Sequence, residues 1–176
     1  MLNLVEQLKQ HDLDTYLHSY RVAELSLRIS QACEHSKMEQ QMVYYGGLLH
    51  DIGKLKINTE ILSKPGKLTN EEWSLIQQHT VYGFEILRSD FKAQTEILYT
   101  VLFHHERMNG LGYPFGINGE HIPVQAQIVA IADSFDAMTN HRSYSKAKTT
   151  MEAIEILQAD EGYSRLLLDK LVDLYK

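Results

Sequence analysis

The chain of 176 residues has almost no cysteine and no long apolar run. Its single cysteine, Cys33, excludes an internal disulfide and is typical of a protein from a reducing compartment. No stretch approaches the roughly 18 consecutive apolar residues that a transmembrane helix needs. The N-terminus lacks the basic start and apolar segment of a secretory signal. We therefore expect a cytoplasmic protein without a membrane segment.

The chain also lacks an excess of basic residues. With 17 Lys and Arg against 23 Asp and Glu, its formal net charge is −6. This charge argues against a protein that binds long nucleic acid through a basic face. A small anionic ligand is not excluded, because bound divalent cations reverse the sign of the local field. The length suits one domain over residues 1–176 with a sizeable core.

Hydrophobic spacing predicts an all-α fold, a single helical-bundle domain. Apolar residues recur every three or four positions, which is the period of an amphipathic helix, and no alternating strand pattern of useful length is present. Thr69 with Glu72, and Thr149 with Glu152, have the spacing of capping boxes. After a short N-terminal helix or lead-in at 1–13, we expect helices at 14–34, at 38–50, from Thr69 through Leu87, at 93–107, at 124–139, from Thr149 onward and at 164–175.

Residues 108–123 interrupt the helical pattern. They hold four of the ten glycines and two of the three prolines of the chain. A loop of this length inside a compact domain is usually functional. We therefore expect a long Gly/Pro loop that carries part of a binding site.

Histidine is the residue type that stands out, with nine in the chain. Several of them combine with aspartates as candidate metal ligands, and imidazole and carboxylate groups are the usual ligands of Zn, Fe and Mn ions. The absence of cysteine among the candidates disfavours a structural thiolate zinc site. Dispersal over several predicted helices is typical of a metal site inside a helical bundle. The candidates are His18, His50, Asp51, His79, His104, His105 and Asp133.

His50 and Asp51 are adjacent in the sequence. Neighbouring residues on a helix diverge by about 100°, so both reach one centre best at a helix end, which Gly53 would supply. The two oxygens of Asp51 could bridge two ions, and a two-metal site indicates hydrolysis of a phosphoester. A lone buried histidine, such as His79 by itself, is more often hydrogen-bonded in a core. Seven candidates, four of them in two adjacent pairs, favour a metal site.

Further motifs surround these residues. They are His50-Asp-Ile-Gly-Lys54, Ile61-Leu-Ser-Lys-Pro-Gly-Lys-Leu68, His104-His-Glu-Arg-Met-Asn-Gly-Leu-Gly-Tyr-Pro114, and Ala132-Asp-Ser-Phe-Asp-Ala-Met138 followed by Arg142 and Tyr144. In this combination they resemble the HD-GYP subgroup of the HD phosphohydrolases, over about residues 14–160. The Gly-Tyr-Pro loop separates this subgroup from other HD hydrolases.

The resemblance implies a metal-dependent phosphodiesterase that hydrolyses the bacterial second messenger cyclic di-GMP to linear pGpG, with a second cut to GMP left open. It implies two or three metal ions, often iron or manganese, held by the seven candidate ligands, with Asp51 also counted as catalytic. Lys54 would contact the scissile phosphate or assist the leaving group. Cyclic di-GMP is the expected partner, as substrate, and whether signalling proteins also bind stays open. The residues expected to contact the substrate are Gly112, Tyr113, Pro114, Arg142, Tyr144 and Lys146.

The chain departs from the family pattern at several positions, and near the C-terminus Tyr163-Ser-Arg165 stands in place of the expected Phe-Asp-Pro. Asp14 stands where three-metal members carry Glu, so the number of metals stays open. Asn109 and Ser143 replace the usual Asp and Pro. These differences keep two alternatives open. One is a module that binds a cyclic dinucleotide or a partner without turnover, and the other is an HD hydrolase of another cyclic dinucleotide or nucleotide.

Overall fold

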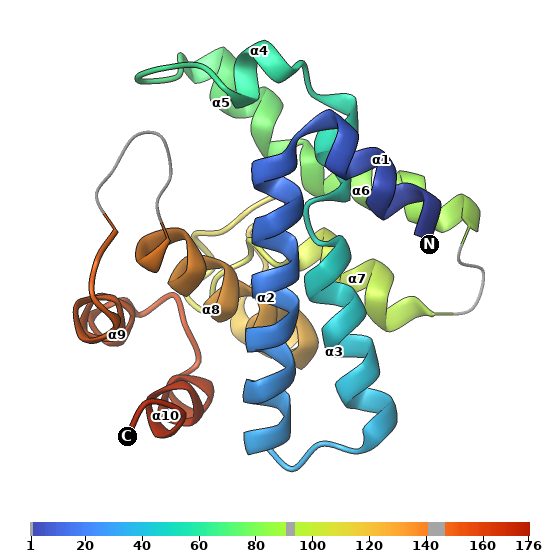
Figure 1. The fold of residues 1–176 in the computed structure, drawn as a ribbon. Helices are drawn as coiled ribbons and strands as arrows, with labels where there is room; N and C mark the ends of the chain where they lie inside the picture. The colour runs from blue at the N-terminus through green and yellow to red at the C-terminus, as the bar shows by residue number, and fades with distance from the viewer. Residues whose placement is uncertain (1, 91–93, 141–146) are drawn as a thin grey trace.

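The computed structural model describes residues 2–90, 94–140 and 147–176. Over these ranges the chain is helical, with no strand, so the predicted all-α fold is confirmed (Figure 1). The α-helices of the described ranges are α1 (Leu2–His11), α2 (Leu13–Ala32), α3 (Lys37–Leu49), α4 (Thr59–Leu62), α5 (Asn70–Gln77), α6 (His79–Asp90), α7 (Thr95–Phe103), α8 (Val124–Thr139), α9 (Thr150–Ala159) and α10 (Arg165–Asp173). Two 3-10 helices, η1 (Ile52–Lys56) and η2 (Gly119–His121), complete them.

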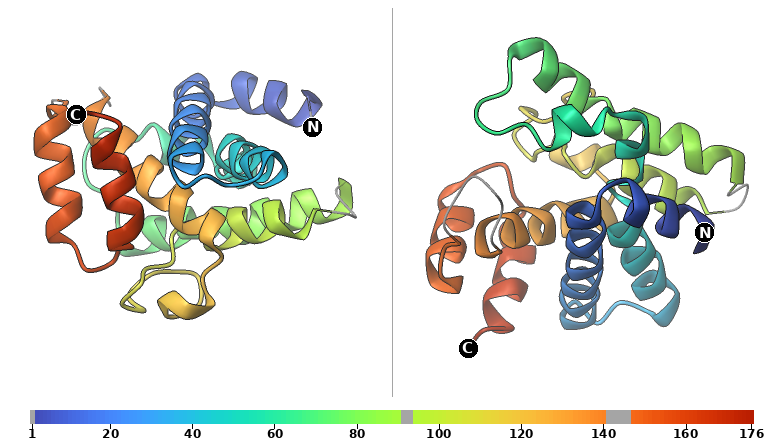
Figure 2. Two further views of the ribbon diagram at one scale, coloured as in Figure 1. Left: turned by 90° about the horizontal axis from the view of Figure 1, so that it is seen from below. Right: turned by 45° about the horizontal axis from the view of Figure 1, so that its top comes forward.

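Helix α2 lies at the centre of the molecule and contributes to two apolar cores (Figure 1). One core joins α2 to α8, α9 and α10 through residues such as Ile29, Ile131 and Leu171. The other joins α2 to α1, α3, η1, α6 and α7 through residues such as Ala23 and Leu49. The left view of Figure 2 shows α9 and α10 side by side at one edge. No helix of the described ranges is both long and apolar enough to cross a membrane.

Glycines allow two close approaches that bring the site together. A Cβ at Gly47 of α3 would lie 2.9 Å from the Cα of Ala23, so the glycine lets α3 pack tightly against α2. A Cβ at Gly53 of η1 would lie 1.9 Å from the carbonyl oxygen of His79. Any side chain at either position would push the helices apart. The backbone of η1 therefore lies directly on the start of α6.

The predicted helix from Thr69 through Leu87 is wrong in one respect, because it is two helices. α5 ends at Gln77 and α6 begins at His79. The Nδ1 atom of His79 lies 2.6 Å from the carbonyl oxygen of Ile76, and the amide of Gln78 donates to Leu75 in a tighter 3-10 turn. The imidazole of His79 thus donates a hydrogen bond to a carbonyl oxygen at the end of α5, where the chain changes direction.

Two other predicted helices end earlier than expected. α7 ends at Phe103, with His104 at the C-cap and His105 beyond it. α3 ends at Leu49, with His50 at the C-cap, and Gly53 belongs to η1 instead of marking the helix end. At both ends an imidazole lies close to a carbonyl of the preceding turn. The expectation that His50 and Asp51 lie at a helix end is nevertheless confirmed.

Helices α4 and α5 form a projecting arm, which we define as residues 58–78 (Figures 1 and 2). No residue of this arm is buried. Side chains of Asn58 and Thr69 cap its two helices, and the Lys64 ammonium lies 2.7 Å from a carboxylate oxygen of Glu72. The arm is therefore held together by its own polar contacts and not by a core.

Candidate metal centre

The seven candidate ligands come together from α2, the end of α3, α6, the end of α7 and α8. Six of them are buried, and His105 is partly exposed. Their ligand atoms form three overlapping groups of the size that a metal ion needs. The groups, each with its atoms within 4.8 Å of one another, are His79, His104 and His105; His18, His50 and Asp133; and His50, Asp51 and His104.

Three of the imidazoles are oriented by their own helices in the same way. The Nδ1 atoms of His50, His79 and His104 lie 2.7, 2.6 and 2.8 Å from backbone carbonyl oxygens three residues earlier. A carbonyl oxygen only accepts hydrogen bonds, so in the neutral imidazole each Nδ1 carries the proton and each Nε2 presents a lone pair. Such an outer contact fixes the tautomer of a metal-binding histidine.

Among the described residues, the Nε2 atoms of these imidazoles lie against acceptor atoms and not against hydrogen-bond donors. Those of His79 and His104 lie 3.2 Å apart, so two lone pairs point toward each other. The Nε2 atom of His50 is fully buried and has no hydrogen-bond partner among the described residues. A buried acceptor without a partner is costly, and a bound cation would satisfy all three. The arrangement therefore fits divalent transition ions.

Burial keeps several imidazoles neutral, which is the form that binds metal. It lowers the pKa of His79 to about 4. Burial, and next the neighbouring His105, hold the pKa of His104 well below 6.5. Burial, and next His79, do the same for the pKa of His105. These three residues are thus ready to act as ligands at neutral pH.

Asp51 lies between the groups and presents a different oxygen to each side. Its Oδ1 is 3.4 Å from Nε2 of His79, and its Oδ2 is 3.4 Å from Nε2 of His50 and 3.9 Å from Nε2 of His18. Lys54 places its ammonium 2.6 Å from Oδ2. Burial acts to raise the pKa of Asp51, but Lys54 and His50 hold it well below the ordinary value. Asp51 is therefore an ionised carboxylate whose two oxygens face different groups.

His18 is held by two carboxylates of α8. Its Nε2 lies 3.0 Å from Asp133 and its Nδ1 lies 2.7 Å from Asp136. Asp136 in turn accepts two hydrogen bonds from Arg21, at 2.8 and 2.9 Å, and one from Asn140 at 2.7 Å. Burial acts to raise the pKa of Asp136, but His18 and Arg21 hold it below its ordinary value. Asp136 stays charged and orients His18.

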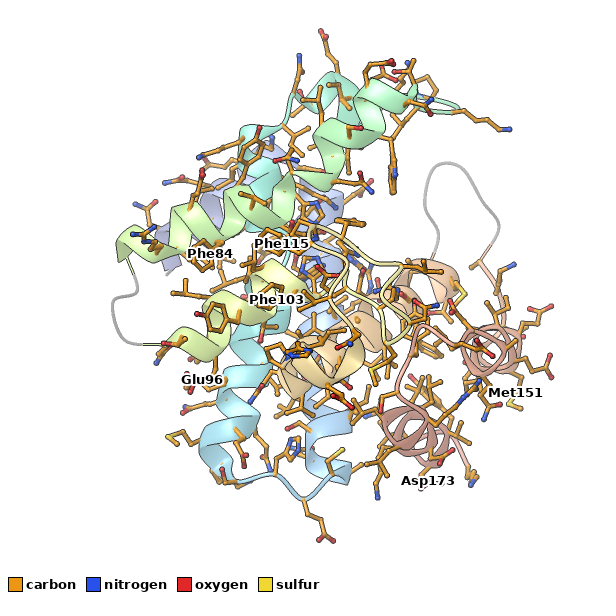
Figure 3. The ribbon with its side chains drawn as sticks, turned by 180° about the vertical axis from the view of Figure 1, so that it is seen from behind. Phe84, Glu96, Phe103, Phe115, Met151 and Asp173 are labelled. Carbon is orange, nitrogen blue, oxygen red and sulfur yellow. The ribbon has the colours of Figure 1, made fainter. Side chains whose placement is uncertain are left out.

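The loop at 108–123 is anchored beside the centre by Glu106. This buried carboxylate accepts hydrogen bonds from the amides of Phe115, at 2.7 Å, and Ile117, at 3.1 Å. A Cβ at Gly112 would lie 2.4 Å from the Cα of Glu106, so only glycine fits there. Figure 3 shows Phe115 near Phe103 of α7, and their ring centroids are 6.1 Å apart. The loop is therefore fixed from both ends of its Gly-Tyr-Pro segment.

Comparison with known proteins assigns this chain to a family. A model of the HD domain matches residues 3–166. The chain belongs to the HD domain family. The His50-Asp51 pair lies inside the matched range, and so do the other five candidate ligands.

Curated relatives of this HD domain are named as cyclic dinucleotide phosphodiesterases. The chain is 38% identical to the cyclic di-GMP phosphodiesterase of Thermotoga maritima, over all of this chain and 48% of that protein. It is 36% identical to the 3′3′-cGAMP-specific phosphodiesterase 2 of Vibrio cholerae, over 98% of this chain and 33% of that protein. The predicted resemblance to the HD-GYP subgroup is thereby confirmed. The chain spans half or less of the length of these relatives.

Solved structures share the fold of the HD domain. The HD domain of an L. monocytogenes phosphodiesterase, in complex with cyclic-di-AMP, matches with a TM-score of 0.74 at 21% identity, over 97% of this chain and 92% of that chain. An HDG"Y"P protein from Bdellovibrio bacteriovorus matches with a TM-score of 0.73 at 21% identity, over 90% of this chain and 51% of that chain. At this level of identity the matches show a common fold.

The structure places some predicted substrate residues and not others. Gly112, Tyr113 and Pro114 lie at the rim of the HD domain's centre, where the Tyr113 ring stacks on His105 at a centroid distance of 4.6 Å. Asp14 is exposed and belongs to none of the three ligand groups. The remaining predicted residues lie outside the described residues; they are Arg142, Tyr144 and Lys146.

Two residues of the site are not among those predicted from the sequence. Asp136 follows Asp133 by three positions, so both carboxylates lie on one face of α8, and this spacing is a signal in the sequence. Glu106 directly follows the His104-His105 pair, but no spacing rule indicates that its carboxylate turns inward to the loop. Its role depends on the loop folding back over α7.

Proposed function

We propose that this HD domain is a metal-dependent phosphodiesterase that hydrolyses cyclic di-GMP to linear pGpG, with GMP as the product of a further cut. The observation that carries the proposal is Asp51, which presents one oxygen to each of two ligand groups. The names of the relatives at 36–38% identity supply the substrate class. We also propose a cytoplasmic location, supported by the single Cys33.

The proposed cofactors are two divalent ions, iron or manganese. One would be held by His79, His104 and His105, the other by His18, His50 and Asp133, with Asp51 between them. Bound there, they would activate a water and neutralise charge on the phosphoryl group. The exposed position of Asp14 supports two ions instead of three. Imidazoles with carboxylates accept iron, manganese and zinc alike, so the choice between them rests on the family resemblance.

Lys54 has a proposed role at the scissile phosphate. Its ammonium is mostly buried, with 16% of the side chain exposed, and lies 2.6 Å from Asp51. A cation in this position can bind a phosphate oxygen and donate a proton to the leaving oxygen. We expect Lys54→Ala to lower turnover while the metal content stays intact, and a loss of metal in this variant would contradict the role.

The test of the proposed function is anaerobic purification followed by elemental analysis and an assay of the same sample. Cyclic di-GMP and 3′3′-cGAMP are offered in parallel, and a chelator-treated sample is the control. We expect about two transition ions per chain and release of pGpG that the chelator abolishes. Absence of bound transition metal would overturn the site. Bound metal without turnover of either compound would favour the binding module.

The assay with 3′3′-cGAMP tests a second candidate function. The relative of Vibrio cholerae named for that compound matches almost the whole chain at 36% identity, close to the value for the cyclic di-GMP enzyme. Faster turnover of 3′3′-cGAMP than of cyclic di-GMP would assign the chain to that substrate instead.

A further inference from the structure

Trp73 is not explained by the packing of the molecule. It is the only tryptophan in the chain, and 47% of its surface is exposed. It lies on α5, and no residue of that helix is buried. Tryptophan offers one of the largest apolar surfaces of any side chain, and a core position would bury it. On the arm, this indole is instead exposed to solvent.

A single aromatic ring separates Trp73 from the metal centre. The ring centroids of Trp73 and Tyr113 are 6.5 Å apart, with the planes at 78°. On its other side, Tyr113 stacks on the imidazole of His105, with centroids 4.6 Å apart and planes at 27°. The indole, the phenol and the imidazole therefore form one continuous row of rings.

This row lies where the centre opens to solvent. The side chains of His105 and Asp133 are 18% and 12% exposed, whereas those of the other candidate ligands are 5% exposed or less. A phosphate approaching the ions has to come from the exposed side. A nucleotide whose phosphate lies there would bring its base next to Tyr113 and Trp73.

The two halves of this aromatic surface are held differently. Tyr113 is fixed, because its amide donates to the carbonyl of His105 and the neighbouring Gly112 is packed against Glu106. Trp73 is carried by the arm, whose polar contacts leave the indole without a buried neighbour on its own helix. The surface thus combines a ring that is fixed by the loop, that of Tyr113, with an exposed ring, that of Trp73, whose face is open to a ligand.

We propose that Trp73 binds a purine base of the cyclic dinucleotide by stacking, next to Tyr113, whose ring plane stands at 78° to the indole, so that Trp73 is a substrate-binding residue of this HD domain. The inference rests on the proposed phosphodiesterase function. Stacking of a base on an aromatic side chain contributes on the order of 1–3 kcal/mol and accepts any base with a large π-face. Trp73 therefore favours purine over pyrimidine dinucleotides without choosing between guanine and adenine.

The first test compares KM and kcat for cyclic di-GMP in Trp73→Leu and Trp73→Phe. We expect Trp73→Leu to raise KM roughly 5- to 150-fold, with kcat within about twofold, because only the binding of the base is lost. Trp73→Phe keeps a ring and falls in between. Leu75→Ala is the matched control. Leu75 is 46% exposed on the same helix but about 200° away from Trp73, so its truncation leaves KM unchanged.

The second test removes the base from the substrate. An abasic cyclic dinucleotide, in which hydrogen replaces both bases, keeps the phosphodiester bonds and carries no aromatic ring, so Trp73→Leu and the unaltered protein should cleave it at equal rates. Equal loss of activity on this compound and on cyclic di-GMP would mean that Trp73 only supports the fold, and would overturn the proposal.

The third test uses Trp73 as its own reporter, since no other tryptophan contributes to the emission. A slowly hydrolysed phosphorothioate analogue of cyclic di-GMP is titrated into the metal-loaded protein. We expect quenching of the indole fluorescence that saturates with the analogue. Saturable binding by calorimetry without any change in fluorescence would overturn the stacking.

These outcomes separate the inference from the function on which it rests. If the unaltered protein binds metal and cleaves no cyclic dinucleotide, the proposed function fails. If it cleaves cyclic di-GMP and Trp73→Leu does so with the same KM, the function stands and the stacking by Trp73 is wrong.

Discussion

The two sides of the candidate metal centre are built by different means. On the imidazole side, which consists of His79, His104 and His105, two of the three residues are oriented by backbone carbonyls of their own turns. On the carboxylate side, which consists of His18, His50 and Asp133, His18 is oriented by side chains of α8, more than one hundred positions away in the chain. The imidazole side depends on local backbone geometry, whereas the carboxylate side combines one such local contact, at His50, with the packing of α2 against α8.

The difference also appears in charge. Burial keeps the imidazole side neutral, as the lowered pKa values of its three residues indicate. On the carboxylate side, burial acts to raise the pKa of Asp133, but its hydrogen bond with His18 holds it well below the ordinary value. A neutral ligand set and a charged one therefore lie next to each other, and Asp51 connects them. The following predictions break or sharpen this contrast.

The largest effect is expected from Asp51→Asn. The amide keeps the size of the side chain but removes the charge and one of the two acceptor oxygens that face the two sides. We expect the metal content to fall below one ion per chain and turnover to fall at least about a thousand-fold, on the scale of several kcal/mol of metal catalysis. Elemental analysis and product assays measure both. Two retained ions would show that Asp51 does not bridge.

The next prediction separates the two sides. His79→Gln and His18→Gln each remove a ligand from one side only. Loss of a ligand costs more than loss of an outer contact, so we expect metal affinity on the altered side to fall more than about a hundred-fold. Elemental analysis should give one ion per chain in each variant, and the double variant none. If either single change removed both ions, the centre would be one cooperative unit.

The pH dependence of stability should also differ between the sides. Between pH 6.5 and about 4, the unfolded chain binds protons at imidazoles such as His79 that stay neutral in the folded protein. The free energy of unfolding of the chelator-treated protein should therefore fall as the pH falls through this window, with His79 contributing on the order of 3 kcal/mol. Asp51 and Asp133, whose pKa values are lowered, should lose their contribution only below about pH 4.

One imidazole acts against this trend. At His50, burial lowers the pKa, but Asp51 outweighs it and raises the pKa overall, so its contribution is lost as the pH rises. The pKa values of three imidazoles, those of His79, His104 and His105, are lowered, so their combined contribution exceeds the opposite contribution of His50. Urea unfolding from pH 8 to pH 4 measures the slope, and His79→Gln should make it shallower. A stability that stays constant from pH 6.5 to 4 would contradict the prediction.

The smallest effect is expected from Asp136→Asn. This change keeps the size of the group that orients His18 but removes its charge and its ion pair with Arg21. Loss of such an outer contact weakens metal binding by about 10- to 100-fold. Titration with a competing chelator should show the weaker affinity at only one of the two ions. Asp173→Asn, at an exposed position of α10, is the control. Equal weakening at both ions would remove the contrast between the sides.

Much of the fold could be predicted from local patterns. The capping boxes at Thr69 and Thr149 are present as predicted, because their hydrogen bonds form within four residues. The ends of α5 and α7 could not be predicted, because the side chains of His79 and His104 form hydrogen bonds with carbonyl oxygens of the preceding turn. Helical periodicity alone does not reveal such competition.

The sequence by itself determined which groups are available: the ligand types, the adjacency of His50 and Asp51, and the Gly-Tyr-Pro loop. Only the tertiary structure decided which of them face each other. It turned the two oxygens of Asp51 to different groups, joined Asp136 to His18, and placed Trp73 beside Tyr113. These contacts join residues far apart in the chain, and packing of helices against one another sets them, whereas spacing along a chain fixes only positions within a few turns.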